Sequence, residues 1–589
     1  MPDKNDNGKD GVKLHAQHDH ASSSTVITLP GVRLDENGEP HIDTADKYFR
    51  FLGHDRGMHF FIDARGRQVT AIKRSGLATK ANLFGIAPLQ FWEREFGQGQ
   101  PFTGQRLDAA INWIIHSSYA KGVFHLERMR GLGAWWDDGR AVIHAGDKLI
   151  VNGETTEIQS FDTRYVYEAL PALNIDLAEP LSDRESMKLY AFSRAINWER
   201  PQYGLFLAGW ATIATVCGAL PWRPHMLLTG PSGGGKTWVT QQLQKLLGEF
   251  VLVAKGETSA AGLRQHLQHD ARPVIFDEAE GEDRWTEGNI NKILGLMRQA
   301  SSEDEGRIFK GGQDGKSASY TIRSMFLLSA IRNPITQTAD ENRITIISLA
   351  KQSPDALKKF RTIVEPLSRE IFTSEWCAKL RARVIRNLPA LRENIEIFRI
   401  GAGEFFRSQR MGDQVAPLLA GTYLLHHTDI ITPERAAEWI RERDWSEQIA
   451  VQEESDEDKV ITALFEARIR VSFDRGSEDF TVGELVEAVI NYTSTTAAVS
   501  AATAYATLAR HGILVQSGSV VVSNTHRAVK HLLRDTSWSI GWARILKRID
   551  GAVSCPDKKS FAGAQSRATS IPYKSIIGNS GSGQGENAT

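Results

Sequence analysis

The chain has 589 residues, of which 41% are hydrophobic and 24% charged, and this composition predicts a soluble globular protein of three or four domains. Its formal net charge of −1 excludes a general electrostatic attraction to nucleic acid, so any such binding has to depend on local basic features. Cys217, Cys377 and Cys555 are too scattered for a disulfide framework or a zinc module, and the polar N-terminal residues do not resemble a secretory leader. We therefore expect a cytoplasmic protein.

Residues 1–44 are polar and are predicted to form a disordered tail. His15, His18 and His20 lack an acidic or cysteine partner there, which favours a solvated tail over a metal site. A small α+β N-terminal domain is predicted for residues 45–155. Its strands are expected at Tyr48–Leu52, His59–Ile62 and Gln68–Ile72, and its helical stretches around Phe91 and Trp113.

Two turn signals, Asp138-Gly139 and Asn152-Gly153, predict hairpins at the end of this domain. Trp135 and Trp136 precede the first turn, and core packing is favoured over stacking on nucleic-acid bases. Further on, Tyr203–Leu220 carries no charge and is long enough to cross a bilayer. Its glycines and alanines favour a buried helix beneath a sheet instead, so no membrane contact is expected.

Residues Gly230–Thr237, GPSGGGKT, match the phosphate-binding pattern G-x-x-x-x-G-K-[ST] at each fixed position. An apolar strand at residues 225–229 precedes the loop, and leucines at helical spacing follow it as far as Gly248. We therefore expect an ATP site in which Lys236 reaches the β and γ phosphates and Thr237 holds Mg²⁺. The predicted nucleotide-binding residues are Gly230, Pro231, Ser232, Gly233, Gly234, Gly235, Lys236 and Thr237.

A second apolar run, Pro273–Phe276, ends in Asp277 and Glu278. Asp277 is predicted to hold Mg²⁺ through water and Glu278 to act as the catalytic base, which favours hydrolysis over phosphoryl transfer to a metabolite. The alternative is an ordinary strand that enters an acidic loop. Alternating strands and helices predict an α/β core with a covered parallel sheet over residues 184–350. Its other strands are expected at Phe250–Val253, Ser324–Ile331 and Ile344–Leu349.

A basic hairpin is predicted from Arg307–Lys310, the turn GGQDG and Lys316–Arg323. In a ring of subunits, Lys310 and Lys316 would point into the central channel and hold the phosphates of a single DNA strand. The alternative is a solvent-exposed hairpin whose lysines are incidental.

Three further polar residues are candidates for the catalytic site. Ser329 and Asn333 each follow the predicted strand closely enough to orient water beside the γ phosphate, and the pattern does not choose between them. Arg343 is placed to be an arginine finger that acts on the ATP of a neighbouring subunit. A surface salt bridge with Asp340 or Glu341 is the alternative.

A helical lid is predicted over residues 351–452, because apolar residues recur there at intervals of three and four. Within it, Arg410 is a candidate second sensor, and pairing between helices is the alternative. The helices are expected at Pro354–Arg383, Ala390–Arg407, Val415–His426 and Pro433–Trp445.

Residues 459–572 are predicted to form a winged-helix-like domain, because three helical stretches precede a two-stranded wing. Such a domain can contact either DNA phosphates or a protein, and the sequence leaves both open. Its candidate phosphate-binding residues are Arg510, His511, His526, Arg527, Lys530 and His531. Residues 573–589 are predicted to form a disordered tail.

Several of these motifs together resemble a known family. The short interval between GPSGGGKT and VIFDEAE, the hairpin before SMFLLSAI and the arginine of DENRITIISL resemble the superfamily 3 type helicase ATPases. The segments LRQHL, ARPVIFDEAE, LGLMRQASSE, DQVAPLLAG and FGIAPLQFWEREF look like the ATPase half of phage and prophage primase-helicase proteins, over residues 45–450.

The resemblance implies a P-loop, AAA+-like ATPase core, a hexameric ring, DNA unwinding and a role in replication. Two features depart from the family pattern. The chain has no cysteine-rich zinc module or acidic polymerising centre, so primer synthesis is not expected, and no asparagine lies within the strand SMFLLSAI.

Two functions follow from these residues. The first is an ATP-hydrolysing, ring-forming DNA helicase or translocase of a phage or mobile-element replication system, with single-stranded or forked DNA and a separate primase as partners. The second is a nucleotide-gated assembly or remodelling ATPase that recruits protein partners without moving along DNA. ATP and Mg²⁺ are the expected cofactors of both.

Overall fold

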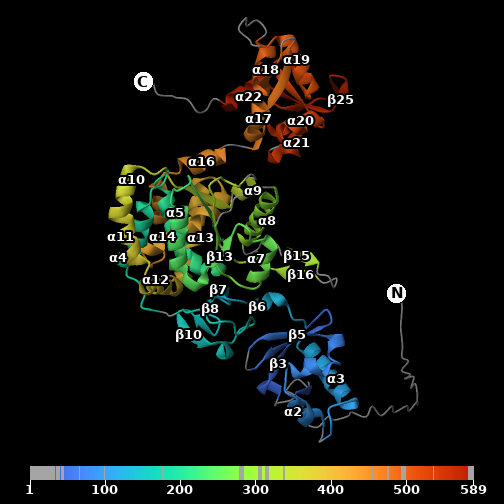
Figure 1. Cartoon of the computed structure of the whole chain (residues 1–589), viewed down its shortest axis with the longest axis vertical. Coiled ribbons are helices and arrows are strands. Elements are labelled where there is room, and N and C mark those ends of the chain that lie inside the picture. The colour runs from blue at the N-terminus through green and yellow to red at the C-terminus, as the bar shows by residue number, and fades with distance from the viewer. Residues whose placement is uncertain are drawn as a thin grey trace, which may run out of the picture. The chain divides into compact units, whose positions relative to one another are not determined.

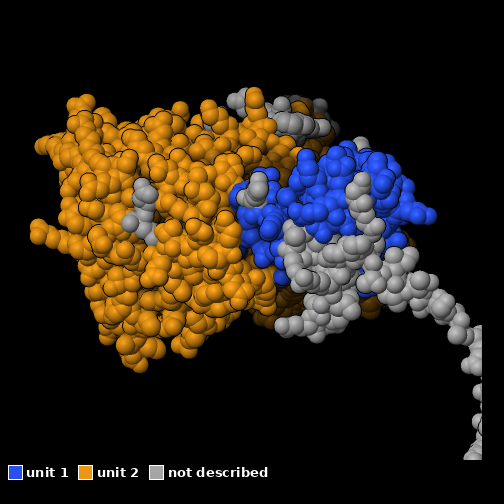
Figure 2. Space-filling model, turned by 90° about the horizontal axis from the view of Figure 1, so that it is seen from below, with its two compact units in different colours: residues 1–129, 166–169 blue, residues 130–165, 170–589 orange. Residues whose placement is uncertain are grey.

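The computed structural model describes sixteen stretches of the chain (Figure 1). These are residues 33–34, 40–41, 45–64, 67–97, 100–175, 178–277, 284–302, 308–311, 317–320, 322–335, 338–341, 343–453, 456–473, 476–491, 499–534 and 536–580. The chain divides into two compact units, residues 1–129 with 166–169 and residues 130–165 with 170–589 (Figure 2). The predicted domain limits are finer than this division and stay predictions.

Unit 1 contains an antiparallel sheet in the order β3-β4-β5 that packs against helices. The three strands predicted in this region are confirmed. Phe49, Phe61 and Trp92 form the centre of an aromatic core, and the indole N–H of Trp92 donates to the carbonyls of Leu83 and Ala87. The elements are β3 (Phe49–Asp55), β4 (Met58–Asp63), β5 (Val69–Lys73), α1 (Lys80–Phe84), α2 (Leu89–Trp92) and α3 (Gln105–Ala120).

The segment predicted as an N-terminal tail lies almost wholly outside the described residues. Its described residues form a short antiparallel pair, β1 (Arg33–Leu34) with β2 (Pro40–His41). The three histidines of that segment also lie outside the described residues.

Unit 2 begins with an antiparallel sheet in the order β10-β9-β8-β7. Both predicted turns are confirmed, because Asp138 and Gly139 have φ angles of 53° and 75° and Asn152 and Gly153 have 50° and 92°, as tight hairpin turns require. Trp135 is 3% exposed, so core packing and not base stacking is its structural role. The strands are β7 (Gly133–Asp137), β8 (Arg140–His144), β9 (Lys148–Val151) and β10 (Glu154–Glu157).

The centre of unit 2 is a five-stranded parallel sheet in the order β13-β14-β17-β12-β18. Side chains alternate between its faces, so Met226 and Leu228 join the core that contains α5 and α14, whereas Leu227 joins the core that contains α7 and α8. The predicted covered parallel sheet is confirmed. Its strands are β12 (His225–Thr229), β13 (Leu252–Lys255), β14 (Val274–Asp277), β17 (Phe326–Ser329) and β18 (Ile344–Ser348).

Helices cover both faces of this sheet. Every residue of α5 is buried, as predicted for the uncharged segment, and no helix among the described residues is long and apolar enough to cross a membrane. Gly209 of α5 lies so close to α14 that a Cβ there would be 2.1 Å from the Leu418 carbonyl oxygen. The helices are α4 (Asp183–Ala195), α5 (Tyr203–Ile213), α6 (Lys236–Leu247), α7 (Ala260–Leu267), α8 (Arg284–Ala300) and α9 (Thr338–Glu341).

The lid, residues 351–452, is helical as predicted, but its first helix is not continuous. The expected helix over Pro354–Arg383 is wrong, because it is interrupted at Phe372 and Thr373, and the Thr373 hydroxyl caps the next helix by accepting from the Trp376 N–H. The helices are α10 (Pro354–Lys359), α11 (Glu365–Ile371), α12 (Ser374–Arg386), α13 (Leu388–Phe405), α14 (Gln409–His426), α15 (Pro433–Arg441) and α16 (Ser446–Glu453).

The C-terminal part of unit 2 has its own hydrophobic core. The three predicted helices and the predicted two-stranded hairpin are present. The structure adds a second hairpin, β19–β20, and the strands β23 and β26, which were not predicted. They are α17 (Asp456–Glu466), β19 (Arg468–Phe473), β20 (Gly476–Thr481), α18 (Val482–Ile490), α19 (Ala501–Arg510), β21 (Ile513–Gln516), β22 (Ser519–Ser523), β23 (Val553–Ser554) and β26 (Ala568–Pro572).

The prediction of disorder from residue 573 onward is wrong for Tyr573–Ser580. These residues form α22, and Ile576 is buried in the same core as the strands of this domain. The remaining elements of the domain are α20 (Arg527–Leu532), α21 (Trp542–Ile545), β24 (Lys559–Phe561) and β25 (Ala564–Ser566).

His225 begins β12 and makes the core sensitive to acid. Its Nδ1 accepts from the Phe326 N–H at 3.1 Å and its Nε2 lies 2.6 Å from the Met297 carbonyl oxygen, so the neutral ring satisfies both neighbours. Burial is the main cause that lowers the pKa of His225 to about 3. The unfolded chain therefore binds a proton below about pH 6.5 that the folded chain excludes.

We predict that the free energy of unfolding decreases as pH falls from about 6.5 towards 3, with His225 contributing up to about 1.4 kcal/mol per pH unit. Urea unfolding of wild type and His225→Gln between pH 8 and pH 5 measures this contribution. The variant should be less stable at pH 8 but show a shallower dependence on pH. Equal slopes for the two proteins would contradict the assignment.

Candidate nucleotide site

The loop Gly230–Thr237 joins the end of β12 to the start of α6, which confirms the predicted strand, loop and helix. Gly235 is the residue immediately before the helix and has a φ angle of 102°, while Gly233 has 72°. Side chains rarely adopt these angles, so glycine at both positions permits the tight curl that turns backbone N–H groups towards one point. The positive end of α6 faces the same region, which suits an anion.

Two other glycines of the loop lie too close to backbone atoms to carry a side chain. A Cβ on Gly230 would lie 2.9 Å from the Leu349 carbonyl oxygen, and one on Gly234 would lie 2.9 Å from the Pro231 carbonyl oxygen. Backbone atoms cannot move aside as a flexible side chain can, so these positions require glycine. The loop therefore follows a tight backbone path that residues larger than glycine would obstruct.

Lys236 and Thr237 are the first two residues of α6. The Lys236 ammonium donates to the carbonyl oxygens of Gly230 at 2.8 Å and Pro231 at 3.1 Å, so it lies across its own loop. Thr237 is exposed at the open side of the loop. An ammonium and a hydroxyl beside a ring of amides fit a magnesium triphosphate, with Lys236 on phosphate oxygens and Thr237 on the metal.

The order of the strands places the predicted acid beside this loop. β17 separates β12 from β14, and the register pairs Leu228 with Ser329 on one side and Phe276 with Leu328 on the other. Because all three strands are parallel, Asp277, Ser329 and the start of the phosphate loop lie along the same edge of the sheet. Glu278, the predicted catalytic base, lies outside the described residues.

The structure places the two water-orienting candidates differently. Ser329 ends β17, is 3% exposed and lies between the phosphate-loop strand and the acid strand. Asn333 is exposed, and its Oδ1 accepts from the Ile335 N–H at 2.9 Å within its own turn. Ser329 is therefore the better placed of the two, although the catalytic role itself stays a prediction.

Arg343 lies at the opposite end of the strands, where their amino ends are. It directly precedes β18, which pairs with β12 from Ile344 opposite His225 to Ser348 opposite Thr229. Five residues of strand therefore separate it from the phosphate loop of its own chain, roughly 16 Å at about 3.3 Å per residue.

The acids proposed as partners of Arg343 have other cations beside them. Asp340 lies 3.0 Å from the Arg298 Nε, and Glu341 lies 3.0 Å from the Lys459 Nζ.

The predicted basic hairpin is confirmed as β15 (Ile308–Gly311) paired with β16 (Ser317–Tyr320) in antiparallel register. Lys310 lies opposite Ala318 in this hairpin. Lys316 lies outside the described residues. The assignment of DNA contact to these two lysines stays a prediction. Arg410, the candidate second sensor, is exposed in the first turn of α14, and its role also stays a prediction.

An apolar cavity beside the phosphate loop was not anticipated from the sequence. It has a volume of about 270 Å³ and is lined by the loop glycines and by side chains from the end of α4, from α6 and from the lid. Trp238 and Phe360 form its aromatic wall, with ring centroids 4.9 Å apart. A flat, apolar recess next to phosphate-binding amides suits the base of a nucleotide. The aromatic residue directly after GKT is a signal that could have indicated it.

The lid contacts the phosphate loop directly. Gln352, two residues before α10, donates from Nε2 to the Gly234 carbonyl oxygen at 3.0 Å and also lines the apolar cavity. Asn197 fixes the neighbouring backbone through two hydrogen bonds. Its side-chain amide donates to the Lys351 carbonyl oxygen at 3.2 Å, and its backbone carbonyl accepts from the Ala350 N–H at 2.9 Å. Movement of the lid would therefore be transmitted to the loop.

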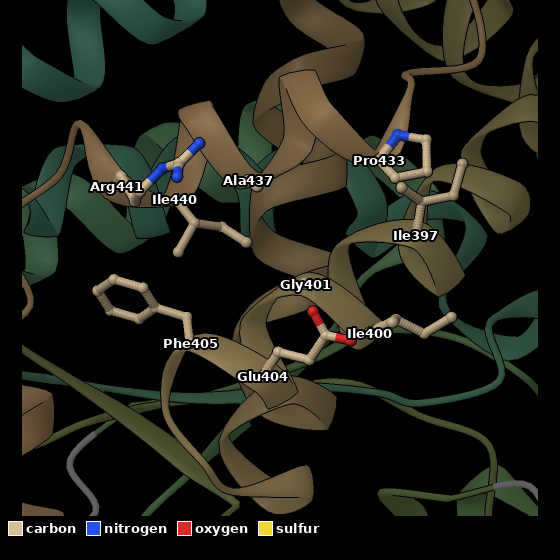
Figure 3. A pocket seen from close by; sticks show the side chains of 9 residues that line it. All are labelled: Ile397, Ile400, Gly401, Glu404, Phe405, Pro433, Ala437, Ile440 and Arg441. Carbon is tan, nitrogen blue, oxygen red and sulfur yellow. The ribbon is translucent and has the colours of Figure 1, made fainter.

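A larger cavity, of about 440 Å³, lies between α13 and α15 and contains no residue of the phosphate loop (Figure 3). It is open and mainly apolar, and Glu404 and Arg441 are its charged residues. Its size therefore does not mark it as the nucleotide site.

No protein-family model matches the chain, and no curated protein matches it. Among solved structures it is similar to one described as SCCmec type IV Cch, an active helicase, with 12% identity and a TM-score of 0.45 over 90% of this chain and 94% of that one. It is also similar to an apo form of the NrS-1 C-terminal region, with 12% identity and a TM-score of 0.34 over 89% and 97% of the two chains. At these values neither likeness assigns a function to the chain.

We predict that Gln352→Ala weakens ATP binding by roughly fivefold, because one neutral hydrogen bond to the loop contributes about 1 kcal/mol. Titration of a fluorescent ATP analogue measures the change. Gln241→Ala, on the exposed face of α6, is the matched control and should bind as wild type does. If both variants bind normally, Gln352 does not position the loop.

Proposed function

We propose that the chain is an ATP-hydrolysing DNA helicase or translocase that acts as a ring, in the replication of a phage or other mobile element. One observation carries this proposal. The phosphate loop, Ser329 and Asp277 lie together at the carboxyl ends of three neighbouring parallel strands. A phosphate cradle with an acid two strands away is an arrangement for hydrolysing a nucleotide, not only for holding it.

In this proposal each group has a separate task. Backbone N–H groups of the loop and Lys236 bind the phosphates, and Thr237 and Asp277 hold Mg²⁺, which would neutralise phosphate charge. Glu278 takes a proton from the attacking water, and Ser329 orients that water. The apolar cavity with Trp238 and Phe360 accepts the base.

Arg343 supports a ring. A guanidinium at the end of the sheet opposite its own phosphate loop is too far away to serve that loop, so its proposed target is the site of an adjoining subunit. The proposed assembly is a homo-oligomer, most simply a hexamer, in the cytoplasm. Its proposed partners are single-stranded or forked DNA and a separate primase.

The basic hairpin β15–β16 distinguishes DNA translocation from a nucleotide-gated ATPase that only recruits proteins. We predict that single-stranded DNA stimulates ATP turnover by wild type, and that in Lys310→Ala/Lys316→Ala the ratio of turnover with and without DNA falls to about one. Unwinding of a forked duplex should be lost in the same variant. Phosphate release and strand-displacement assays measure the two effects. Normal unwinding by the variant would contradict the assignment of DNA contact to the hairpin.

The arginine finger gives an independent test of the ring. Arg343→Ala should lower ATP turnover by roughly 10³-fold, as expected when a finger is lost, with little change in ATP affinity. Lys236→Ala should also be inactive, but mixing the two variants should restore partial turnover, because some interfaces then combine an intact loop with an intact arginine. Mixed oligomers that remain as inactive as the separate variants would contradict action between subunits.

A further inference from the structure

The C-terminal domain carries a local excess of positive charge in a chain whose formal net charge is −1. No Asp or Glu occurs from residue 499 to residue 534, whereas Arg510, Arg527, Lys530 and Arg534 lie in this stretch. Three of these four cations fall within or directly after α20 (Arg527–Leu532). The charge is therefore concentrated on one short element.

Helical spacing places the cations of α20 on one side. Arg527, Lys530 and His531 are separated by three and four residues and are all exposed. Arg534 is also exposed just beyond the helix, and its Nη1 lies 3.2 Å from the His531 Nε2. We name these four residues the basic face of α20. From Arg527 to Arg534 it extends about 10 Å at about 1.5 Å per residue.

The opposite side of α20 anchors it to the domain. Val529 and Leu533 are fully buried in the C-terminal core, and the His526 side chain caps the helix by accepting from the Ala528 N–H. The basic face is therefore held by a packed element. Among the described residues, neither Arg527 nor Lys530 forms an ion pair with a carboxylate.

The composition of the surface indicates what it binds. Protein interfaces have an apolar or aromatic centre, whereas the four residues of the basic face are all polar and Ile540, which is 79% exposed, lies outside it. Single-stranded nucleic acid is held by rows of stacked aromatic rings, which this face also lacks. Clustered cations match the regularly spaced phosphates of a duplex.

We propose that the basic face of α20 binds the phosphate backbone of double-stranded DNA, independently of base sequence. The site is separate from the nucleotide site and from the hairpin β15–β16, and it does not depend on the proposed ATPase activity. α19, the helix that precedes the wing, is a poorer candidate, because its sequence AATAYATLAR has a single cation at its end.

Equilibrium binding of the full chain to a 30-base-pair duplex, measured by fluorescence anisotropy without nucleotide, tests this site. Arg527→Ser/Lys530→Ser should weaken binding by roughly 30-fold at 0.15 M salt and reduce the slope of log K against log salt by about 2, since each lost contact removes about 0.9. Two duplexes of different sequence should be affected equally. Arg527→Lys/Lys530→Arg keeps the charge and should bind as wild type does.

The matched control is Arg468→Ser/Arg470→Ser, which removes the same charge from exposed positions on β19 of the same domain. It should bind the duplex normally, and thermal melting of each variant verifies folding. An equal loss in the control would show a bulk charge effect and overturn the proposal. Unchanged duplex binding by the α20 variant, or a loss limited to single-stranded DNA, would overturn it as well.

Discussion

Backbone hydrogen bonding between parallel strands is the constraint on which the candidate site depends. Parallel pairing puts the carboxyl ends of neighbouring strands at one edge, and the register of β12, β17 and β14 brings the phosphate loop, Ser329 and Asp277 to that edge together. The same pairing of β12 with β18 sends Arg343 to the other edge. One set of hydrogen bonds thus separates the groups that we propose to serve a subunit's own nucleotide from the arginine that we propose to serve a neighbour's.

The lid adds a second constraint, because it completes the nucleotide cavity from a different part of the chain. Gln352 bonds to a carbonyl of the phosphate loop, and Phe360 packs against Trp238 of the helix that follows the loop. Lys236 meanwhile donates to carbonyls of its own loop. Phosphate binding would replace those bonds of Lys236, so loop and lid are positioned to respond together to the nucleotide.

Strongly patterned segments were predicted well from the sequence. The glycines and flanking apolar runs of GPSGGGKT determine strand, loop and helix locally, and Asp138-Gly139 determines a tight turn through backbone angles alone. The break of the lid helix at Phe372 and the helix α22 after residue 573 were missed. The break has a local signal in Thr373, which caps α12, whereas α22 depends on burial of Ile576 against partners that are distant in sequence.

By itself, therefore, the sequence determined which residues are candidates for binding phosphate and metal, because that chemistry requires particular residue types at fixed spacing. Only the tertiary structure decided which of them meet. It favoured Ser329 over Asn333, because sheet order is set by long-range strand pairing that no local pattern encodes. It also assembled the recess of Trp238 and Phe360 and gathered the cations of α20 on a packed helix, since burial of one side defines which side remains exposed.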